Sequence, residues 1–71
     1  MNFKRGDLVF LSPYDTVNVS LPHLRGKIGE VVDVHGQVLR INFPEIDFSI
    51  TLLADRFVTV ETYFDMISTL K

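Results

Sequence analysis

The sequence of 71 residues contains no cysteine and no tryptophan, and it has only four glycines and three prolines. Without cysteine, neither a disulfide nor a thiolate zinc site can stabilise the fold. Stability must therefore come from a hydrophobic core, and 46% of the residues are hydrophobic, which is enough for one compact core. A chain of this length holds one domain. The lack of tryptophan argues against polyproline recognition, because grooves that dock such peptides are lined by stacked aromatic side chains.

The sequence also lacks a basic excess, since its formal net charge is −2. The charges are unevenly placed. Residues 1–27 carry four basic and two acidic side chains, whereas residues 28–71 carry three basic and seven acidic ones. Nucleic-acid binding proteins usually carry a basic excess, which favours the release of counterions. The charge balance therefore favours a protein partner over a nucleic acid.

No long hydrophobic run is present, and the apolar runs are too short to cross a bilayer. The basic start, Met1 to Arg5, is not followed by the apolar stretch of a secretion signal. We therefore expect no membrane association. Together with the absence of cysteine, this predicts a cytoplasmic location.

Short apolar runs separated by turn residues predict five strands. The first covers Leu8–Leu11 and ends at Pro13, and a long connection of residues 13–26 follows, in which Val17, Val19 and Leu21 suggest a short extended arm. The second strand covers Lys27–Val34, and its apolar pattern requires a bulge, because Val31, Val32 and Val34 cannot share one face. The later elements are a His35-Gly36 turn, strands over Val38–Phe43 and Phe48–Leu52, a turn over Pro44–Asp47, a 3₁₀ turn at Ala54–Arg56 and a strand over Val58–Glu61.

The end of the chain changes to helical spacing. Tyr63, Met66, Ile67 and Leu70 lie at i, i+3, i+4 and i+7, which places them on one helical face. Thr62 is the predicted N-cap, Asp65 lies in the predicted first turn, and Lys71 near the C-terminal end. A helix of about two turns is unstable alone, so its apolar face must dock on the sheet or on a partner.

These elements predict a mainly β fold, a five-stranded SH3-like barrel with a short C-terminal helix. The barrel is expected over residues 1–62 and the helix over residues 63–71, as parts of one domain. The segments Gly6–Leu11, Arg25–Val34 and Val38–Ile41 resemble the KOW-type SH3-like barrels of ribosomal proteins and bacterial transcription elongation factors. That pattern has Gly-Asp entering the first strand and paired glycines, here Gly26 and Gly29, before a Val-rich strand. The glycines are expected where the backbone crowds and bends.

No catalytic chemistry is predicted. His23 and His35 lie in different loops with no further ligands beside them, and a metal site needs three or four ligands in one place. The sequence contains neither a nucleophile motif nor a phosphate-binding glycine loop. We therefore expect no enzyme activity, no metal and no cofactor.

The residues predicted to bind a partner lie near the starts of the first two strands and in the long loop. Lys4, Arg5, Arg25 and Lys27 are expected to gather at one end, and the aromatic rings of Tyr14 and His23 lie in the loop beside them. Arg40 on a polar strand face completes the set Lys4, Arg5, Tyr14, His23, Arg25, Lys27 and Arg40.

The sequence thus predicts a small non-catalytic protein–protein interaction module, an accessory or regulatory protein of a bacterial or phage complex. It would act through the loop of residues 13–26 or an exposed sheet edge. The alternative is a KOW-like RNA- or DNA-binding module that uses the basic residues, a possibility that the net charge disfavours. A homo-oligomer formed through edge strands or terminal helices is a third possibility, and the sequence leaves the oligomeric state open.

Overall fold

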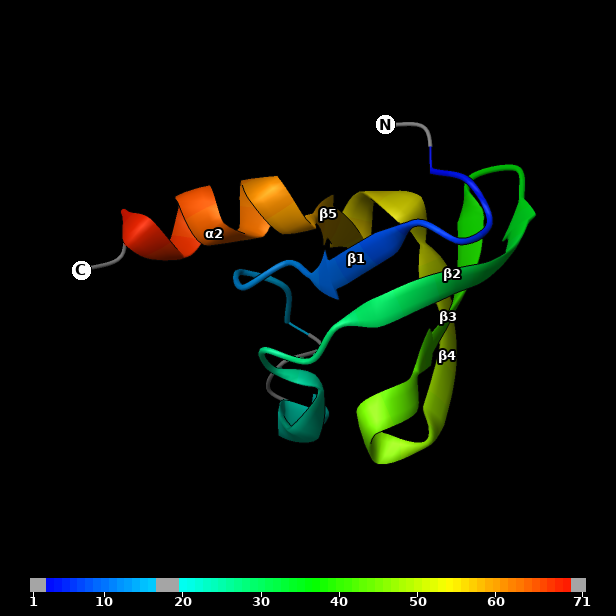
Figure 1. Ribbon diagram of the computed structural model, residues 1–71, viewed down its shortest axis with the longest axis horizontal. Helices are drawn as coiled ribbons and strands as arrows, with labels where there is room; N and C mark the ends of the chain where they lie inside the picture. The colour runs from blue at the N-terminus through cyan, green and yellow to red at the C-terminus, as the bar shows by residue number, and fades with distance from the viewer. Residues whose placement is uncertain (1–2, 17–19, 70–71) are drawn as a thin grey trace.

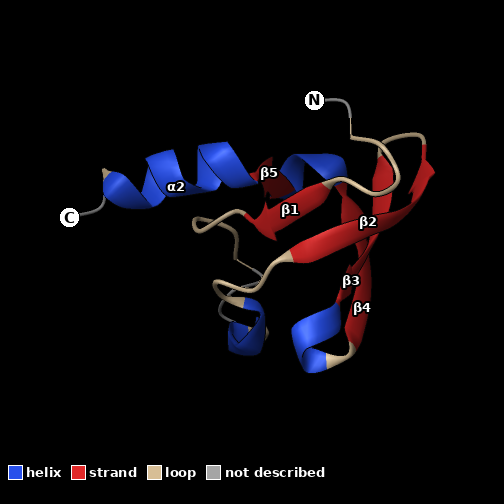
Figure 2. Cartoon of the chain, in the orientation of Figure 1, coloured by secondary structure: helices blue, strands red, loops and turns tan. Residues whose placement is uncertain are grey.

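A computed structural model of the chain describes residues 3–16 and 20–69. It confirms a mainly β fold with five antiparallel strands in one sheet and a short C-terminal helix (Figures 1 and 2). The strands are β1 (Leu8–Leu11), β2 (Gly29–His35), β3 (Val38–Phe43), β4 (Phe48–Leu53) and β5 (Phe57–Thr59). The helices are the 3₁₀ turns η1 (Pro22–Leu24), η2 (Pro44–Ile46) and η3 (Ala54–Arg56), and the α-helix α2 (Val60–Ser68).

The sheet has the strand order β4-β3-β2-β1-β5, so β4 and β5 form its two edges. No ladder joins these edges within residues 3–16 and 20–69. The sheet is therefore open, and the closed barrel expected from the sequence is not confirmed. β1 lies between β2 and the short edge strand β5 and pairs with both.

Strict alternation correctly predicted the strands that bury one face. The bounds of β1 and β3 match the predictions, and Leu39, Ile41 and Phe43 of β3 are buried while Arg40 is exposed. The predicted bulge is also present, because the β2–β3 register shifts between Val31 and Asp33. The bulge explains why the apolar residues of β2 do not follow period two.

The core lies on the inner face of the sheet. It contains the side chains of Phe3, Val9, Leu11, Leu24, Val31, Leu39, Ile41, Phe43 and Phe57. Fully burying one side chain of this size contributes about 1.5–3 kcal/mol, so the set is the main source of stability in a chain without disulfides. Leu24 reaches it from η1, which shows that the long connection between β1 and β2 is anchored to the core.

The β2–β3 turn lies one residue later than predicted. The β2–β3 hairpin turns at Gly36-Gln37, because His35 still pairs with Val38, and Gly36 takes the positive φ of 60°. Gly36 is therefore the first residue of the turn and His35 the last residue of the strand. The predicted 3₁₀ turn at Ala54–Arg56 is confirmed as η3.

The C-terminal helix begins earlier than predicted. It starts at Val60, and Thr59 is the N-cap, because the Thr59 Oγ1 accepts a hydrogen bond of 3.1 Å from the Thr62 backbone N–H. The prediction of Thr62 as N-cap is wrong, and the acid in the first turn is Glu61 rather than Asp65. The predicted positions Leu70 and Lys71 lie outside the described residues.

The predicted extended arm of the long connection falls mostly on residues that the structure does not describe, since Val17 and Val19 are among them. Leu21, the third member of that pattern, is half-buried and packs against the core. Within the described ranges, no helix is both long and apolar enough to cross a membrane.

Candidate functional site

The four basic residues expected to gather at one end are separated. Lys4 and Arg5 lie in the turn that leads into β1, and this turn is held beside β2 by a 2.8 Å hydrogen bond from the Gly6 N–H to the Val31 carbonyl. β1 and β2 are antiparallel, with Val9 opposite Gly29. Arg25 and Lys27, which precede β2, therefore lie toward the other end of β1. The predicted single basic cluster is wrong because it assumed that the two strand starts are adjacent.

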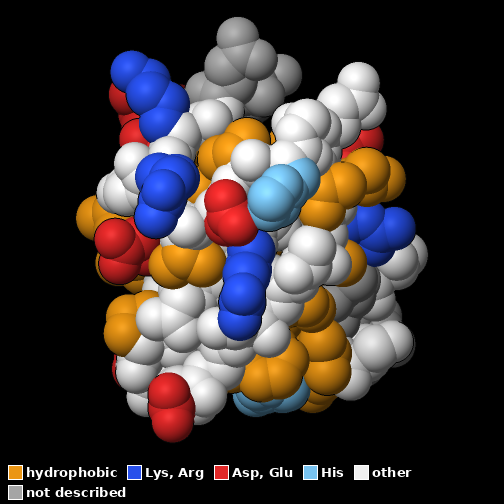
Figure 3. Space-filling model, turned by 90° about the vertical axis from the view of Figure 1, so that its right-hand side faces the viewer, with side chains coloured by type: hydrophobic (Ala, Val, Ile, Leu, Met, Phe, Trp, Pro, Cys, Tyr) orange, Lys and Arg blue, Asp and Glu red, His pale blue; other side chains and the backbone are white. Residues whose placement is uncertain are grey.

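Arg5 and Arg40 lie near acidic side chains on the outer side of β2 and β3. Arg40 is paired in register with Asp33, whose Oδ2 atom lies 2.8 Å from the Nε2 atom of His35. The hydrogen bond from His35 lowers the pKa of the Asp33 carboxyl. The Val34 N–H and the charges of His35 and Arg5 lower this pKa further, whereas desolvation raises it. Figure 3 shows that basic and acidic side chains are intermixed on this side of the molecule.

Lys27 and His23 are held by contacts near the start of β4. The Lys27 Nζ lies 3.2 Å from a Glu45 carboxylate oxygen, and the His23 ring packs edge-on against Phe48 with centroids 5.3 Å apart. Arg25 is exposed just after η1. The structure therefore brings Lys27 and His23 to the η2 end of the sheet, apart from Lys4, Arg5 and Arg40.

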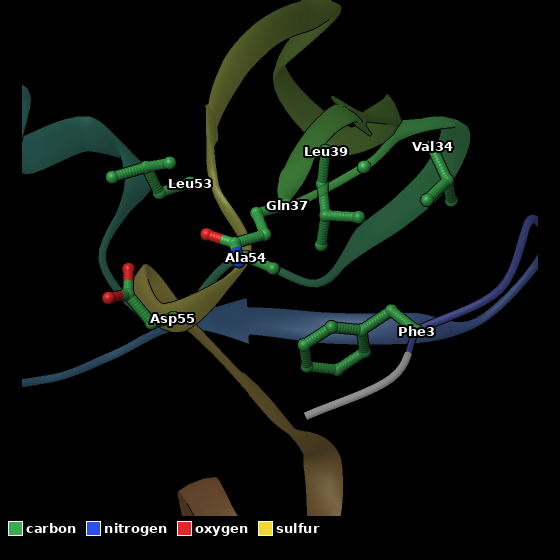
Figure 4. A pocket seen from close by; sticks show the side chains of 8 residues that line it. Phe3, Val34, Gln37, Leu39, Leu53, Ala54 and Asp55 are labelled. Carbon is green, nitrogen blue, oxygen red and sulfur yellow. The ribbon is translucent and has the colours of Figure 1, made fainter.

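A cleft of about 440 Å³ lies between the β2–β3 turn and the end of β4 (Figure 4). The N-terminal segment contributes Phe3, and β4 and η3 contribute the rim residues Leu53 and Asp55. Its lining consists of Phe3, Val34, Gly36, Gln37, Leu39, Leu53, Ala54 and Asp55. The exposed lining combines apolar side chains with polar groups, so the cleft offers both apolar contacts and hydrogen-bond partners.

A second depression lies on the other side of Leu53 and Asp55. It is lined by Tyr14, Asp15 and Thr16 from the long connection and by Leu53, Asp55 and Arg56. The Arg56 guanidinium lies 3.3 Å from the Asp15 carboxylate, and the Arg56 carbonyl accepts a 2.8 Å hydrogen bond from the Ser12 N–H. These contacts hold the start of the connection against η3. They also place the exposed Tyr14 ring beside Leu53.

We refer to the two depressions together as the Leu53 surface. Tyr14 and Leu53 are 59% and 46% exposed, which makes them accessible apolar contacts. Asp55 lines both depressions and forms no ion pair within the described residues. The surface thus offers a cleft with both apolar and polar lining, an aromatic ring and a carboxylate that can accept hydrogen bonds from a cation.

Of the residues predicted to bind a partner, only Tyr14 lies on the Leu53 surface. Sequence reasoning missed Phe3, Leu53 and Asp55. A signal for Leu53 was present, because the Leu52-Leu53 pair breaks the alternation of β4 and forces one leucine to the exposed side. No comparable pattern indicated Phe3, which reaches the cleft from a segment outside the strands.

No group of three His, Asp or Glu side chains that could hold a metal ion occurs in residues 3–16 and 20–69. No protein-family model matches the chain, and neither a curated protein nor a solved structure matches it significantly.

Proposed function

We propose that this chain is a non-catalytic protein–protein interaction module that binds its partner at the Leu53 surface. The observation that carries the proposal is the junction of two depressions at Leu53 and Asp55, beside the exposed ring of Tyr14. Exposed aromatic and aliphatic side chains next to a cavity are the usual anchors of a protein interface. The chain would serve as an accessory or regulatory part of a larger complex.

The layout of the sheet supports an SH3-like interpretation of the fold, which forms part of the proposal. The strand order, the long connection between β1 and β2, and the 3₁₀ turn between β4 and β5 are all consistent with such a domain. A shared fold does not define a partner. The function is therefore argued from the Leu53 surface rather than from the fold.

The chemistry of the surface favours a partner segment with an apolar side chain beside a basic one. The apolar side chain would enter the cleft above Phe3 and Leu39, which are 9% and 1% exposed. A lysine or arginine next to it would meet the Asp55 carboxylate at the rim. Burying the apolar group contributes most of the affinity, and the charge fixes the orientation.

Partner capture with matched variants tests this proposal. The protein and its Leu53→Ser and Tyr14→Ser variants are used as bait in lysate of the source organism, and Thr51→Ser, a change at another exposed position of β4, is the control. We expect the unmodified chain and the control to retain one or more proteins. The amount of these proteins retained by each of the two variants should be lower by at least about tenfold, as for an interface hot spot. Identical capture by all four baits would refute the assignment of the surface.

Nucleic-acid binding stays the alternative prediction, and the separation of Lys4 and Arg5 from Arg25 and Lys27 gives it less support. Titration of fluorescent single- and double-stranded RNA and DNA at low salt tests it directly. Binding that weakens steeply with added salt and with Arg5→Ala or Arg25→Ala would favour this alternative. No affinity at low salt would eliminate it.

A further inference from the structure

The outer face of the sheet carries a second set of apolar side chains, on the side of β1 opposite the core. Phe10 lies at its centre and is covered by α2, because the Tyr63 ring stacks on it at 4.0 Å and the Phe64 ring meets it edge-on at 5.8 Å. Val58 lies beside Phe10 in the β1–β5 ladder. The helix thus docks on the β1–β5 part of the outer face.

The helix leaves the margins of this apolar face uncovered. Leu8 lies two residues before Phe10 on the same side of β1 and is 54% exposed. Ile28, which directly precedes Gly29 opposite Val9, is 44% exposed, and Phe64 is 51% exposed on the helix itself. Leu8, Ile28 and Phe64 therefore surround the Phe10–Tyr63 stack, and we call them the outer patch.

Such an arrangement is unusual for a surface that faces only water. Single exposed apolar residues are common, but several large ones grouped on one rigid face mark an interaction site. Docking of α2 uses Phe10 and the Tyr63 and Phe64 rings that contact it. Polar side chains at positions 8 and 28 would serve equally well if these positions faced only solvent.

The charges around the outer patch indicate which occupant it fits. Glu30 is opposite Leu8 in the β1–β2 register, Glu61 lies one helical turn before Phe64, and Asp65 follows it. The described part of α2 contains no basic residue. Arg25, next to Gly26 near the Tyr63 hydroxyl, is a basic residue at the margin. A second copy docked here would oppose these acids with its own, which argues against self-association.

We propose that the outer patch is a second interaction surface, which docks a segment of another protein that combines apolar side chains with lysine or arginine. The apolar side chains would cover Leu8, Ile28 and Phe64, and the basic groups would meet Glu30 and Glu61. The patch shares no residue with the Leu53 surface. Two independent surfaces would allow the chain to join two partners, a role that goes beyond binding at the Leu53 surface.

Site-specific photo-crosslinking tests the chemistry of the partner. A photoreactive amino acid replaces Leu8 in the full chain, or replaces Thr51 in the control, and the crosslinked peptides from lysate of the source organism are sequenced. We expect position 8 to capture segments that contain both apolar and basic residues, and position 51 not to capture them. Crosslinks to this chain itself, to acidic segments, to the same segments from both positions, or to nothing would each overturn the proposal.

Charge reversal separates specific docking from general stickiness. Glu30→Lys and Leu8→Ser are expected to lower this capture, read from a photoreactive residue at position 28, by at least about tenfold, as for an interface hot spot. Asp55→Lys, a reversal of an exposed acid in η3, is expected to leave it unchanged. Equal losses with Glu30→Lys and Asp55→Lys would overturn the proposal.

The two proposals can fail separately. Leu53→Ser, which alters the Leu53 surface, is expected to leave capture at the outer patch unchanged. A thermal melt of each variant confirms that it is folded, since a polar substitution at an exposed site usually changes stability little. Loss of crosslinking in Leu53→Ser, with its melting temperature unchanged, would show that only one interface exists.

Discussion

Replacing Gly29 with alanine is expected to destabilise the protein by about 2 kcal/mol. Gly29 faces the core from β2, and a Cβ atom there would collide with the Ile41 Cγ2 atom and lie 3.1 Å from the Phe43 ring. Both neighbours are fully buried. Overpacking of this kind costs about 1–3 kcal/mol. We place the cost near the upper limit and subtract about 0.4–1 kcal/mol for the reduced entropy of the unfolded chain.

Thermal and urea unfolding followed by circular dichroism measure this effect. A domain of this size loses roughly 4–8 °C in Tm per kcal/mol, so Gly29→Ala is expected to melt roughly 8–16 °C lower. The urea midpoint should fall without a change in slope, because the change acts on packing and not on the surface exposed.

A double-mutant cycle identifies the colliding atom. Ile41→Ala removes the Cγ2 methyl, so Gly29→Ala is expected to cost less than half as much in that background. Gly6→Ala is the control, because Gly6 has a φ of 92° and no atom within 4 Å of an added Cβ. Its cost is backbone strain and should not depend on residue 41. An unchanged Tm for Gly29→Ala, or an equal cost in both backgrounds, would refute the packing argument.

Three further predictions follow from individual contacts. Thr59→Ala removes the N-cap of α2 and is expected to cost about 1 kcal/mol in urea unfolding; an unchanged midpoint would contradict the capping role. The pKa of Asp33 is lowered from 3.8, so its contribution to stability is present above that value and is lost as the pH falls through the lower folded pKa. His35→Ala is expected to raise this pKa in a carboxyl NMR titration, and no change would contradict the hydrogen bond. Lys27→Met removes an exposed ion pair with Glu45 and is expected to cost at most about 1 kcal/mol, a cost that 1 M salt should reduce.

The sequence predicts most strand positions because one face of each strand is buried. Alternation is clear in β3, where Leu39 and Ile41 point inward and Arg40 outward. The start of α2 was less predictable. Val60 continues the alternation that begins at Val58, so the local pattern extends the strand, whereas packing of Tyr63 on Phe10 favours a helix from Val60 onward. The tertiary contact between Tyr63 and Phe10 therefore outweighs the local pattern at the boundary between β5 and α2.

The candidate site was harder to predict than the fold, because it depends on which ends of which strands meet. The register of β1 against β2 separates Lys4 from Lys27, and that register is set by core packing of Val9 and Gly29. Tyr14 was recognised as an exposed aromatic residue of the long connection. Its neighbour Leu53 lies 39 residues later in the chain, and only folding brings them together.

The place of β1 between β2 and β5 also has a consequence for synthesis of the chain. β1 leaves the ribosome before its neighbour β5, which pairs Thr59 with Val9, 50 residues away, and α2 covers Phe10 only after that. Closing so long a loop is slow compared with forming the β2–β3 hairpin. Until β5 and α2 emerge, Phe10 is exposed and one edge of β1 is unpaired. The nascent chain is therefore most prone to aggregation just before β5 emerges.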